Sequence, residues 1–330
     1  MTRSFIIPVI DFSPASKYNI KTLLEDLKNI EGEVIVIFNS PEVAGELMHH
    51  SRIDHFAIMK KNIGVARAWN IGLDISRTEI SFVLNSDLKI QEEAVKKLEW
   101  NLLNLHKAAI VGVQGSFFHF ESLADIQYFD KGSFQKPISV DAVSGFFFAT
   151  KTELFHNKIL KFENKFTPCY NEEWDLGFQV KEFGLNSYIV PTTNYLHSWS
   201  GSISSMKTVK YYDSENTFDE IATRNKQIFI HKWQIRFKNN PELKLSRFID
   251  WALPKVDDIT NNKDYKFAHQ ILALIIQFYP STIDAWMKLG DLYQLQCNFL
   301  QAKECYQKGL ELDPIRSDLK SKVSQIQSLL

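Results

Sequence analysis

The first 113 residues alternate apolar runs with amphipathic segments, and this alternation constrains the fold more than any other feature of the chain. Residues 4–10 and Glu33–Phe38 are apolar almost throughout, as expected of strands that are buried on both faces. Between them, residues 18–30 place leucine and isoleucine on one side of a helix. Strand–helix–strand units of this kind form parallel sheets covered by helices. The chain is therefore predicted to begin with an α/β domain built on a mainly parallel sheet.

The alternation continues to about residue 190 and then gives way to charged, helical sequence. Helices are expected at residues 65–76 and 92–105, and from about 207 to 250. Strands are expected at Ile80–Leu84, 108–113, 140–150 and 187–190. This pattern places the α/β domain at residues 1–240.

A different period follows in the last 80 residues. Trp286, Leu289, Gly290 and Tyr293 are followed by Ala302, Tyr306, Gly309 and Pro314, a spacing that resembles the tetratricopeptide repeat. Its small residues let two helices approach closely, with Trp286 and Tyr293 filling the groove between them. An unrelated helical hairpin is the alternative. We therefore expect an all-α module at residues 250–330, able to bind a protein partner or a second copy of the chain.

Composition and charge narrow the partners. The net charge of −1 and the pI of about 6.8 give no basic excess, so a nucleic-acid partner is not expected. The three cysteines form no CxxC pair, which argues against a disulfide framework and favours the reducing cytoplasm. No apolar stretch approaches the roughly 18 residues that span a bilayer. The protein is expected to be soluble, with at most peripheral membrane contact.

Two motifs follow one another in the first domain. The first runs from Asn62 through Gly64, Arg67 and Asn70, and the second is the strand end Asn85-Ser-Asp87. In this order they resemble the family 2 inverting glycosyltransferases, particularly the rhamnosyltransferase-like branch, over about the first 235 residues. The resemblance implies the GT-A fold, a Rossmann-like α/β domain. It also implies transfer of a sugar from a nucleoside-diphosphate sugar to a hydroxyl acceptor, which is a glycan, a lipid-linked glycan or a protein.

Asp87 is the expected metal ligand. It follows a predicted parallel strand, at the sheet edge where open α/β folds bind ligands. A divalent cation, Mn²⁺ or Mg²⁺, would stabilise the charge of the leaving diphosphate. In the resembled family this turn reads D-x-D, and here Asn85 replaces the first acid. An ordinary strand-end turn is the alternative reading of Asn-Ser-Asp.

A second block, Glu172, Glu173 and Asp175, looks like the family's acidic helix start. The acceptor hydroxyl loses a proton as it attacks, and a nearby carboxylate can take that proton as general base. By position Glu173 matches the family's base, Glu172 precedes it, and Asp175 matches a second acid that orients the helix or the substrate. The alternative is that these acids have no catalytic role and lie there because the positive end of a helix dipole favours negative charge.

A third block ends in His197, which the resemblance places opposite Asp87 as a metal ligand; imidazole suits Mn²⁺. A purely structural histidine is the alternative. Ser200-Gly-Ser202 after it has the composition of a mobile hinge.

The residues expected to bind the nucleotide are inferred from the resemblance. It assigns Pro8 and Asp11, after the first strand, and Asn39, after the second, to the base and ribose. Arg67 is either a diphosphate ligand or a solvated helix residue. The remaining four shape the pocket: Asn62, Gly64 and Asn70 form its wall, and Gly145 forms its floor beneath the acceptor.

Two other functions compete with this prediction. A nucleotidylyltransferase would need a glycine-rich, arginine-containing loop after the first strand, where this chain has Asp-Phe-Ser-Pro-Ala-Ser. The second competing function is that of a catalytically weakened scaffold that acts through its repeat. It is considered because Asn85 and Phe38 stand where the family often has acids.

Overall fold

The computed structural model describes residues 2–12, 16–198, 207–244 and 247–329. The chain forms two compact units, Met1–Leu245 and Ser246–Leu330. The first is α/β and the second is all-α, which confirms the predicted fold class. Across the described part of the chain, no helix combines the length and apolar character needed to cross a bilayer.

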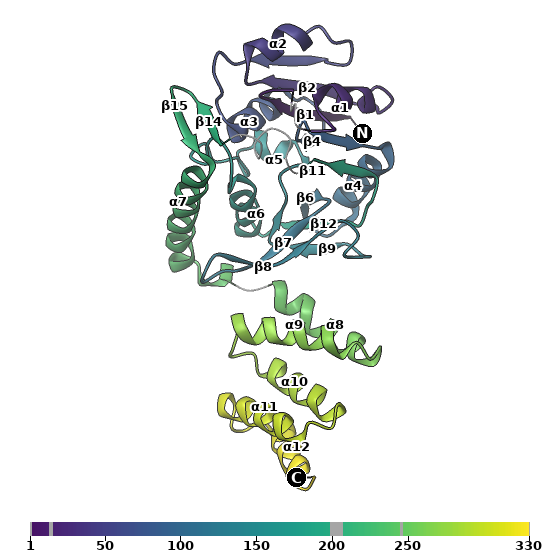
Figure 1. Ribbon diagram of the computed structural model, residues 1–330, viewed down its shortest axis with the longest axis vertical. Coiled ribbons are helices and arrows are strands. Elements are labelled where there is room, and N and C mark those ends of the chain that lie inside the picture. The colour runs from purple at the N-terminus through teal and green to yellow at the C-terminus, as the bar shows by residue number, and fades with distance from the viewer. Residues whose placement is uncertain (1, 13–15, 199–206, 245–246, 330) are drawn as a thin grey trace. The chain divides into compact units, whose positions relative to one another are not determined.

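The main sheet of the first unit is mostly parallel. Its strands are β1 (Arg3–Val9), β2 (Glu33–Phe38), β3 (His55–Ile58), β4 (Ile80–Leu84), β6 (Ala108–Gly112), β9 (Ile138–Val140), β11 (Phe147–Lys151) and β12 (Asn186–Ile189). Their spatial order is β3-β2-β1-β4-β11-β6-β12-β9 (Figure 1). β11 runs antiparallel between β4 and β6, and β9 is antiparallel at the edge. The carboxyl ends of β1, β2 and β4 therefore meet at one edge of the sheet.

The helices of the first unit bury most of their apolar residues. They are α1 (Ile20–Leu27), α2 (Pro41–Leu47), α3 (Val65–Ile75), α4 (Glu92–Asn104), α5 (Glu153–His156), α6 (Glu172–Glu182) and α7 (Phe218–Asn239), followed by a 3₁₀ turn at Pro241–Lys244. Asn19 caps α1 in a capping box with Thr22. On α3, a Cβ added to Gly72 would lie 2.2 Å from Ile6, so only glycine lets this helix lie so close to β1.

Three smaller sheets complete the first unit. β5 (Leu88–Ile90) pairs with β13 (Tyr195–His197). β8 (Ala124–Phe129), β7 (Gly115–His119) and β10 (Ala142–Val143) form a three-stranded sheet. β14 (Thr208–Tyr211) and β15 (Ser214–Thr217) form a hairpin.

The structure corrects two expectations from the sequence. Residues 140–150 are not one strand: β10 pairs with β7, the chain turns through Ser144 and Gly145, and only then does β11 enter the main sheet. The buried carboxylate of Asp141 accepts a hydrogen bond from the backbone of Phe118, which holds this segment on the smaller sheet. Residues 207–217 form the β14–β15 hairpin rather than helix, and α7 begins only at Phe218.

α6 and α7 pack together through aromatic side chains. Phe178 of α6 lies 5.1 Å from Phe229 and 5.2 Å from Trp233 of α7, measured between ring centroids. Phe118 and Phe120 of the smaller sheet join the same cluster. This packing fixes α6, whose first turn carries the acidic motif.

The second unit consists of α8 (Arg247–Asn261), α9 (Tyr265–Phe278), α10 (Ile283–Leu295), α11 (Phe299–Leu312) and α12 (Ser317–Gln327). A Cβ on Gly290 of α10 would lie 2.4 Å from the ring of Tyr306, so glycine brings α10 and α11 into close contact. The Tyr306 hydroxyl donates to Asp291 at 2.7 Å. Tyr306 thus fills the place predicted for Trp286, which is half-buried and donates to the carbonyl of Pro280 at 2.8 Å.

Candidate functional site

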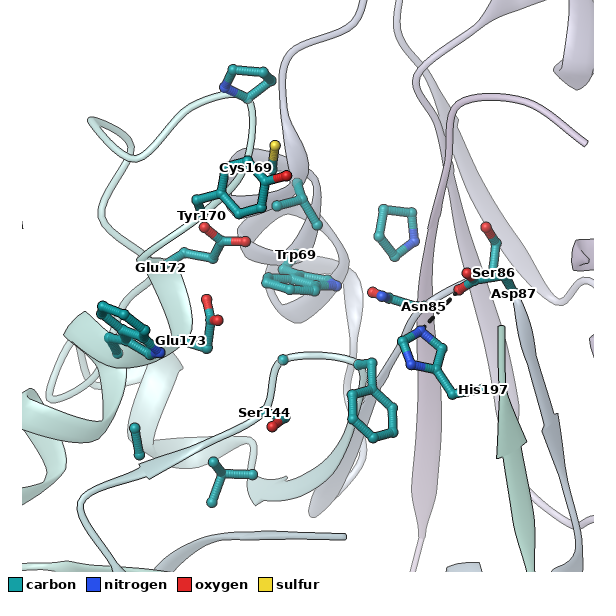
Figure 2. A pocket seen from close by; sticks show the side chains of 18 of the residues that line it. Trp69, Asn85, Ser86, Asp87, Ser144, Cys169, Tyr170, Glu172, Glu173 and His197 are labelled. Carbon is teal, nitrogen blue, oxygen red and sulfur yellow. Dashed lines mark ion pairs between the residues drawn. The ribbon is translucent and has the colours of Figure 1, made fainter. Parts of the chain in front are cut away.

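A pocket of about 750 Å³ opens at the carboxyl ends of β1, β2 and β4. It is walled by the turn between β10 and β11, by β13 and by the start of α6, which carry Ser144, His197 and the Glu172–Glu173 pair in Figure 2. β8 of the smaller sheet forms a further wall. The backbone N–H of Asn85 donates to the carbonyl of Phe146 at 2.9 Å, which ties the end of β4 to this turn. The site is thus assembled from segments far apart in the sequence.

Nine of the predicted site residues meet in this pocket. They are Pro8, Asn39, Asn62, Asn85, Asp87, Gly145, Glu172, Glu173 and His197. Pro8, Asn39, Asn85 and Asp87 lie at or after the ends of β1, β2 and β4, which are neighbours in the main sheet, while His197 reaches the pocket on β13 and Glu172 and Glu173 reach it at the start of α6.

Five other predicted residues, Asp11, Gly64, Arg67, Asn70 and Asp175, are not among the described residues that line the pocket. Gly64 has φ of 84°, and a Cβ there would lie 2.9 Å from the backbone of Pro168. Asn70 donates to the carbonyl of Phe162 at 2.8 Å. Both residues support the wall from behind. The predicted hinge at Ser200-Gly-Ser202 lies outside the described residues.

Arg67 lies on α3 against the β14–β15 hairpin. Its guanidinium donates to the hydroxyls of Tyr211 and Tyr212 and lies 5.4 Å from the centre of the Tyr212 ring. The hairpin is also joined to Asn62, whose side chain donates to the carbonyl of Lys210 at 2.9 Å. Arg67 therefore binds the hairpin in this structure. The sequence had left open a contact between Arg67 and a diphosphate.

Asp87 and His197 form a close pair on one side of the pocket. The Asp87 Oδ1 and His197 Nε2 atoms are 3.3 Å apart, and both side chains are about nine-tenths buried. β13 pairs with β5 so that His197 lies opposite Leu88, next to Asp87 in sequence. The imidazole stacks on Phe146, with ring centroids 4.2 Å apart. Two residues 110 positions apart are thus held within reach of a single ion.

The pair fits a cation whose coordination is completed by its ligand. One carboxylate oxygen and one imidazole nitrogen are donors that Mn²⁺ accepts. Among the described residues, no group of three or more His, Cys, Asp or Glu side chains could hold an ion without such help. Further ligands would have to be water and phosphate oxygens, as is usual for cations bound with nucleotides.

Glu172 and Glu173 begin α6 on the other side of the pocket. Glu172 is 5% exposed, and its Oε2 atom has no hydrogen-bond partner among the described residues. Burial raises the pKa of Glu172 well above its usual range, and the charge of Glu173 raises it further. Burial also raises the pKa of Glu173, which is half-buried. One of these two carboxylates therefore holds its proton more tightly than its neighbour.

The pocket lining is rich in acidic side chains. Five carboxylates line it, from Asp87, Asp125, Asp130, Glu172 and Glu173, and the described lining contains no lysine or arginine. The segments outside the described residues contain neither residue type in their sequence. A ligand that carries phosphate would meet repulsion here unless a cation accompanied it.

Asp175 is placed differently from its neighbours. Its side chain is fully buried and faces α7, where it accepts hydrogen bonds from Lys232 at 2.8 Å and from the indole N–H of Trp233 at 2.8 Å. Gln179 donates to it at 2.7 Å. These contacts make Asp175 a positioning residue that anchors the first turn of α6.

Several residues that line the pocket were not predicted from the sequence, and three of them, Asp125, Tyr128 and Asp130, lie on or directly after β8 of the smaller sheet. Tyr128 on β8 donates to Gln114 at 2.7 Å and lies 2.9 Å from the Ser144 hydroxyl. The others are Trp69, Cys169, Tyr170 and Trp174. Trp69 and Trp174 carried a usable signal, because Trp69 lies inside the Asn62–Asn70 motif and Trp174 lies between Glu173 and Asp175 of the acidic motif.

Comparisons with known proteins add to this description. The tetratricopeptide repeat family matches residues 283–315, which confirms the predicted repeat. No curated protein matches the sequence. A crystal structure of GalNAc-T7 with UDP, GalNAc and Mn²⁺ is similar at 11% identity and a TM-score of 0.47, over 60% of this chain and 44% of that one. A crystal structure of S. aureus TarS 1–349 is similar at 12% identity and a TM-score of 0.45, over 100% of this chain and 92% of that one. The chain thus spans less than half of the GalNAc-T7 chain.

Proposed function

We propose that the first unit is an inverting glycosyltransferase of the GT-A type, related to family 2, which moves a sugar from a nucleoside-diphosphate sugar to a hydroxyl acceptor. The observation that carries the proposal is the composition of one pocket. It holds an Asp–His pair suited to a cation and, on its other side, the carboxylates of Glu172, which is buried, and Glu173, which is half-buried. The sequence motifs that resemble family 2 supply most of these residues.

The donor would lie along the carboxyl ends of the parallel strands. Pro8 and Asn39, which the resemblance assigns to the nucleoside, line the pocket, and Asn62 lines its wall. Asp87 and His197 would hold a divalent cation beside the diphosphate. When bound, that cation would offset the charge of the diphosphate and of the leaving nucleotide. Without it, the acidic lining would oppose donor binding.

Glu173 is the better candidate for the general base. The acceptor oxygen forms a bond to the anomeric carbon while the bond from that carbon to the diphosphate breaks, and the acceptor proton passes to a carboxylate. That carboxylate must be ionised beforehand. Glu172 is the more deeply buried of the pair, and the charge of Glu173 raises its pKa further. Glu172 thus holds its proton more tightly than Glu173, which leaves Glu173, the less buried of the two, as the carboxylate better able to take the acceptor proton.

The second unit supports a separate proposal, that of a protein-binding module. The match to a tetratricopeptide repeat favours it, and Leu295 and Leu300 at the α10–α11 turn are 58% and 56% exposed. The module would recruit a protein acceptor, another protein or a second copy of this chain. If the first unit were a scaffold without activity, this binding would be the function of the whole chain.

Donor hydrolysis tests the enzymatic proposal. The full chain is incubated with UDP-, dTDP- and GDP-sugars, with and without Mn²⁺, and nucleotide release is measured. We expect release from one nucleotide class, at least tenfold faster with Mn²⁺, and a loss of this metal effect in Asp87→Asn and His197→Ala. Asp74→Asn, on the exposed side of α3, is the matched control. Absence of metal-dependent release from every donor would favour the scaffold.

A further inference from the structure

The indole of Trp69 is an unused hydrogen-bond donor in the wall of the pocket. Trp69 lies on α3, is 2% exposed and lines the pocket. Its ring packs on Phe162, with centroids 4.8 Å apart, which fixes its orientation. The Nε1 atom is buried, and no described residue accepts a hydrogen bond from it.

Such a donor is costly to leave unpaired. A buried N–H without a partner loses its hydrogen bond to water and gains nothing in return, so the great majority of buried polar groups in proteins are paired. At the Trp69 position a phenylalanine would fill most of the same space without this cost. A tryptophan here is therefore explained if a bound ligand supplies the acceptor.

The position of the ring identifies the part of the ligand. Figure 2 shows Trp69 between the Glu172–Glu173 pair and the group formed by Asn85, Asp87 and His197. The far edge of the ring approaches Gly145, where an added Cβ would lie 3.2 Å from Trp69 Cη2 and 3.4 Å from Glu173 Cβ. The indole thus lies between the proposed cation site and the proposed base.

In a transfer between these two sites, the group that must lie between them is the sugar itself. The diphosphate is on the side of Asp87, and the acceptor hydroxyl is on the side of Glu173. We propose, on the basis of the proposed function, that the Trp69 indole N–H donates a hydrogen bond to an oxygen of the transferred sugar. Trp69 is then a residue that determines donor specificity, and its ligand is a sugar hydroxyl or acetamido oxygen.

The test separates the sugar from the nucleotide. Affinities for the donor found by the hydrolysis panel and for the corresponding nucleoside diphosphate are measured with Mn²⁺ by calorimetry, for the wild type and Trp69→Phe. Phenylalanine keeps an aromatic ring and removes the N–H. Trp100→Phe is the matched control, because Trp100 on α4 is 62% exposed and lies outside the pocket lining. Melting temperatures are recorded for both variants.

We expect Trp69→Phe to weaken binding of the donor about tenfold, as for one lost buried hydrogen bond, and to leave binding of the nucleoside diphosphate within twofold. Equal loss for both ligands, or no loss for either, would overturn the proposal. The wild type supplies a second measurement that needs no variant: removal of one sugar oxygen from the donor must weaken binding about tenfold. Uniform affinity for all deoxy donors would overturn it too. If none of the tested nucleotides bound the wild type, the proposed function itself would be contradicted.

Discussion

Replacement of Asp175 by asparagine distinguishes a structural acid from a chemical one. The carboxylate is fully buried and receives three side-chain donors, from Lys232, Trp233 and Gln179. Burial raises the pKa of Asp175 more than these partners lower it, so the charge of Asp175 is not itself a source of stability. Asparagine keeps the shape of the side chain but offers only one acceptor oxygen. The cost of the substitution therefore lies in the donors that it leaves unpaired.

The most expensive of these is the Lys232 ammonium, which lies 2.7 Å from Asp175 Oδ1 and whose side chain is 20% exposed. Removing one partner of a buried ion pair costs about 3–5 kcal/mol. Lys232 retains some access to water and a distant second acid, Glu163 at 4.0 Å, so the low end, about 3 kcal/mol, applies here. For a domain of this size, that loss lowers the melting temperature by roughly 6–12 °C.

Thermal unfolding followed by circular dichroism measures this effect, and donor hydrolysis measures the remaining activity at a temperature well below both transitions. Asp74→Asn, an exposed acid on α3, is the control for the change of charge. We expect Asp175→Asn to melt at a clearly lower temperature than the wild type. Its activity should be reduced but not lost, because α6 is held less firmly. A variant that melted with the wild type yet lost all activity would refute the reasoning, because Asp175 would then take part in the reaction.

Three further outcomes follow from single residues. Burial raises the pKa of Glu172 above its usual 4.5, so the folded protein binds this proton more tightly than the unfolded chain, and stability falls as pH rises through that raised value. Glu172→Gln should therefore melt above the wild type at pH 8 and close to it at pH 4; an equal difference at both would contradict this. Gly145→Ala places a methyl group 3.2 Å from the Trp69 ring, and we expect donor hydrolysis to fall about tenfold at an unchanged melting temperature. Gly290→Ala pushes a methyl group to within 2.4 Å of Tyr306 and should destabilise the second unit by about 1–3 kcal/mol in urea unfolding; a stability equal to the wild type's would show that the helices adjust freely.

The parts of the fold that could be predicted are those with long, regular patterns. The apolar runs of β1, β2 and β4 and the leucine stripe of α1 carry their own period, so the sequence specifies them locally. The repeat at α10 and α11 could be predicted for the same reason. β5, β10 and β13 have three residues or fewer, and no period can be recognised at that length. Their existence depends on partners that the sequence does not identify.

Site residues could be predicted where they follow a strand that the sequence itself specifies. Residues that follow a predictable strand, such as Asn39 and Asp87, could be assigned to the ligand edge of the sheet before the structure was known. Tyr128 and Asp125 could not, because β8 reaches the pocket only through its pairing with β7 in a separate sheet. Arg67 was open between a diphosphate contact and a solvated position, because either suits an arginine in the first turn of a helix. The structure shows a third arrangement, in which the β14–β15 hairpin, where helix was expected, accepts a hydrogen bond from Arg67.

The Asp87–His197 pair shows how strongly the site depends on a short contact that no local pattern encodes. β5 and β13 share only three paired positions, Leu88 with His197, Lys89 with Leu196 and Ile90 with Tyr195. Successive side chains of a strand point to opposite faces, so a slip by one residue would turn the imidazole away from Asp87 and bring the half-exposed Leu196 into its place. Tyr195, buried beside Phe147, and the stacking of His197 on Phe146 oppose that slip. The apolar contacts of β13 with β11 and the turn before it therefore set the register, and the register in turn brings the two proposed cation ligands together.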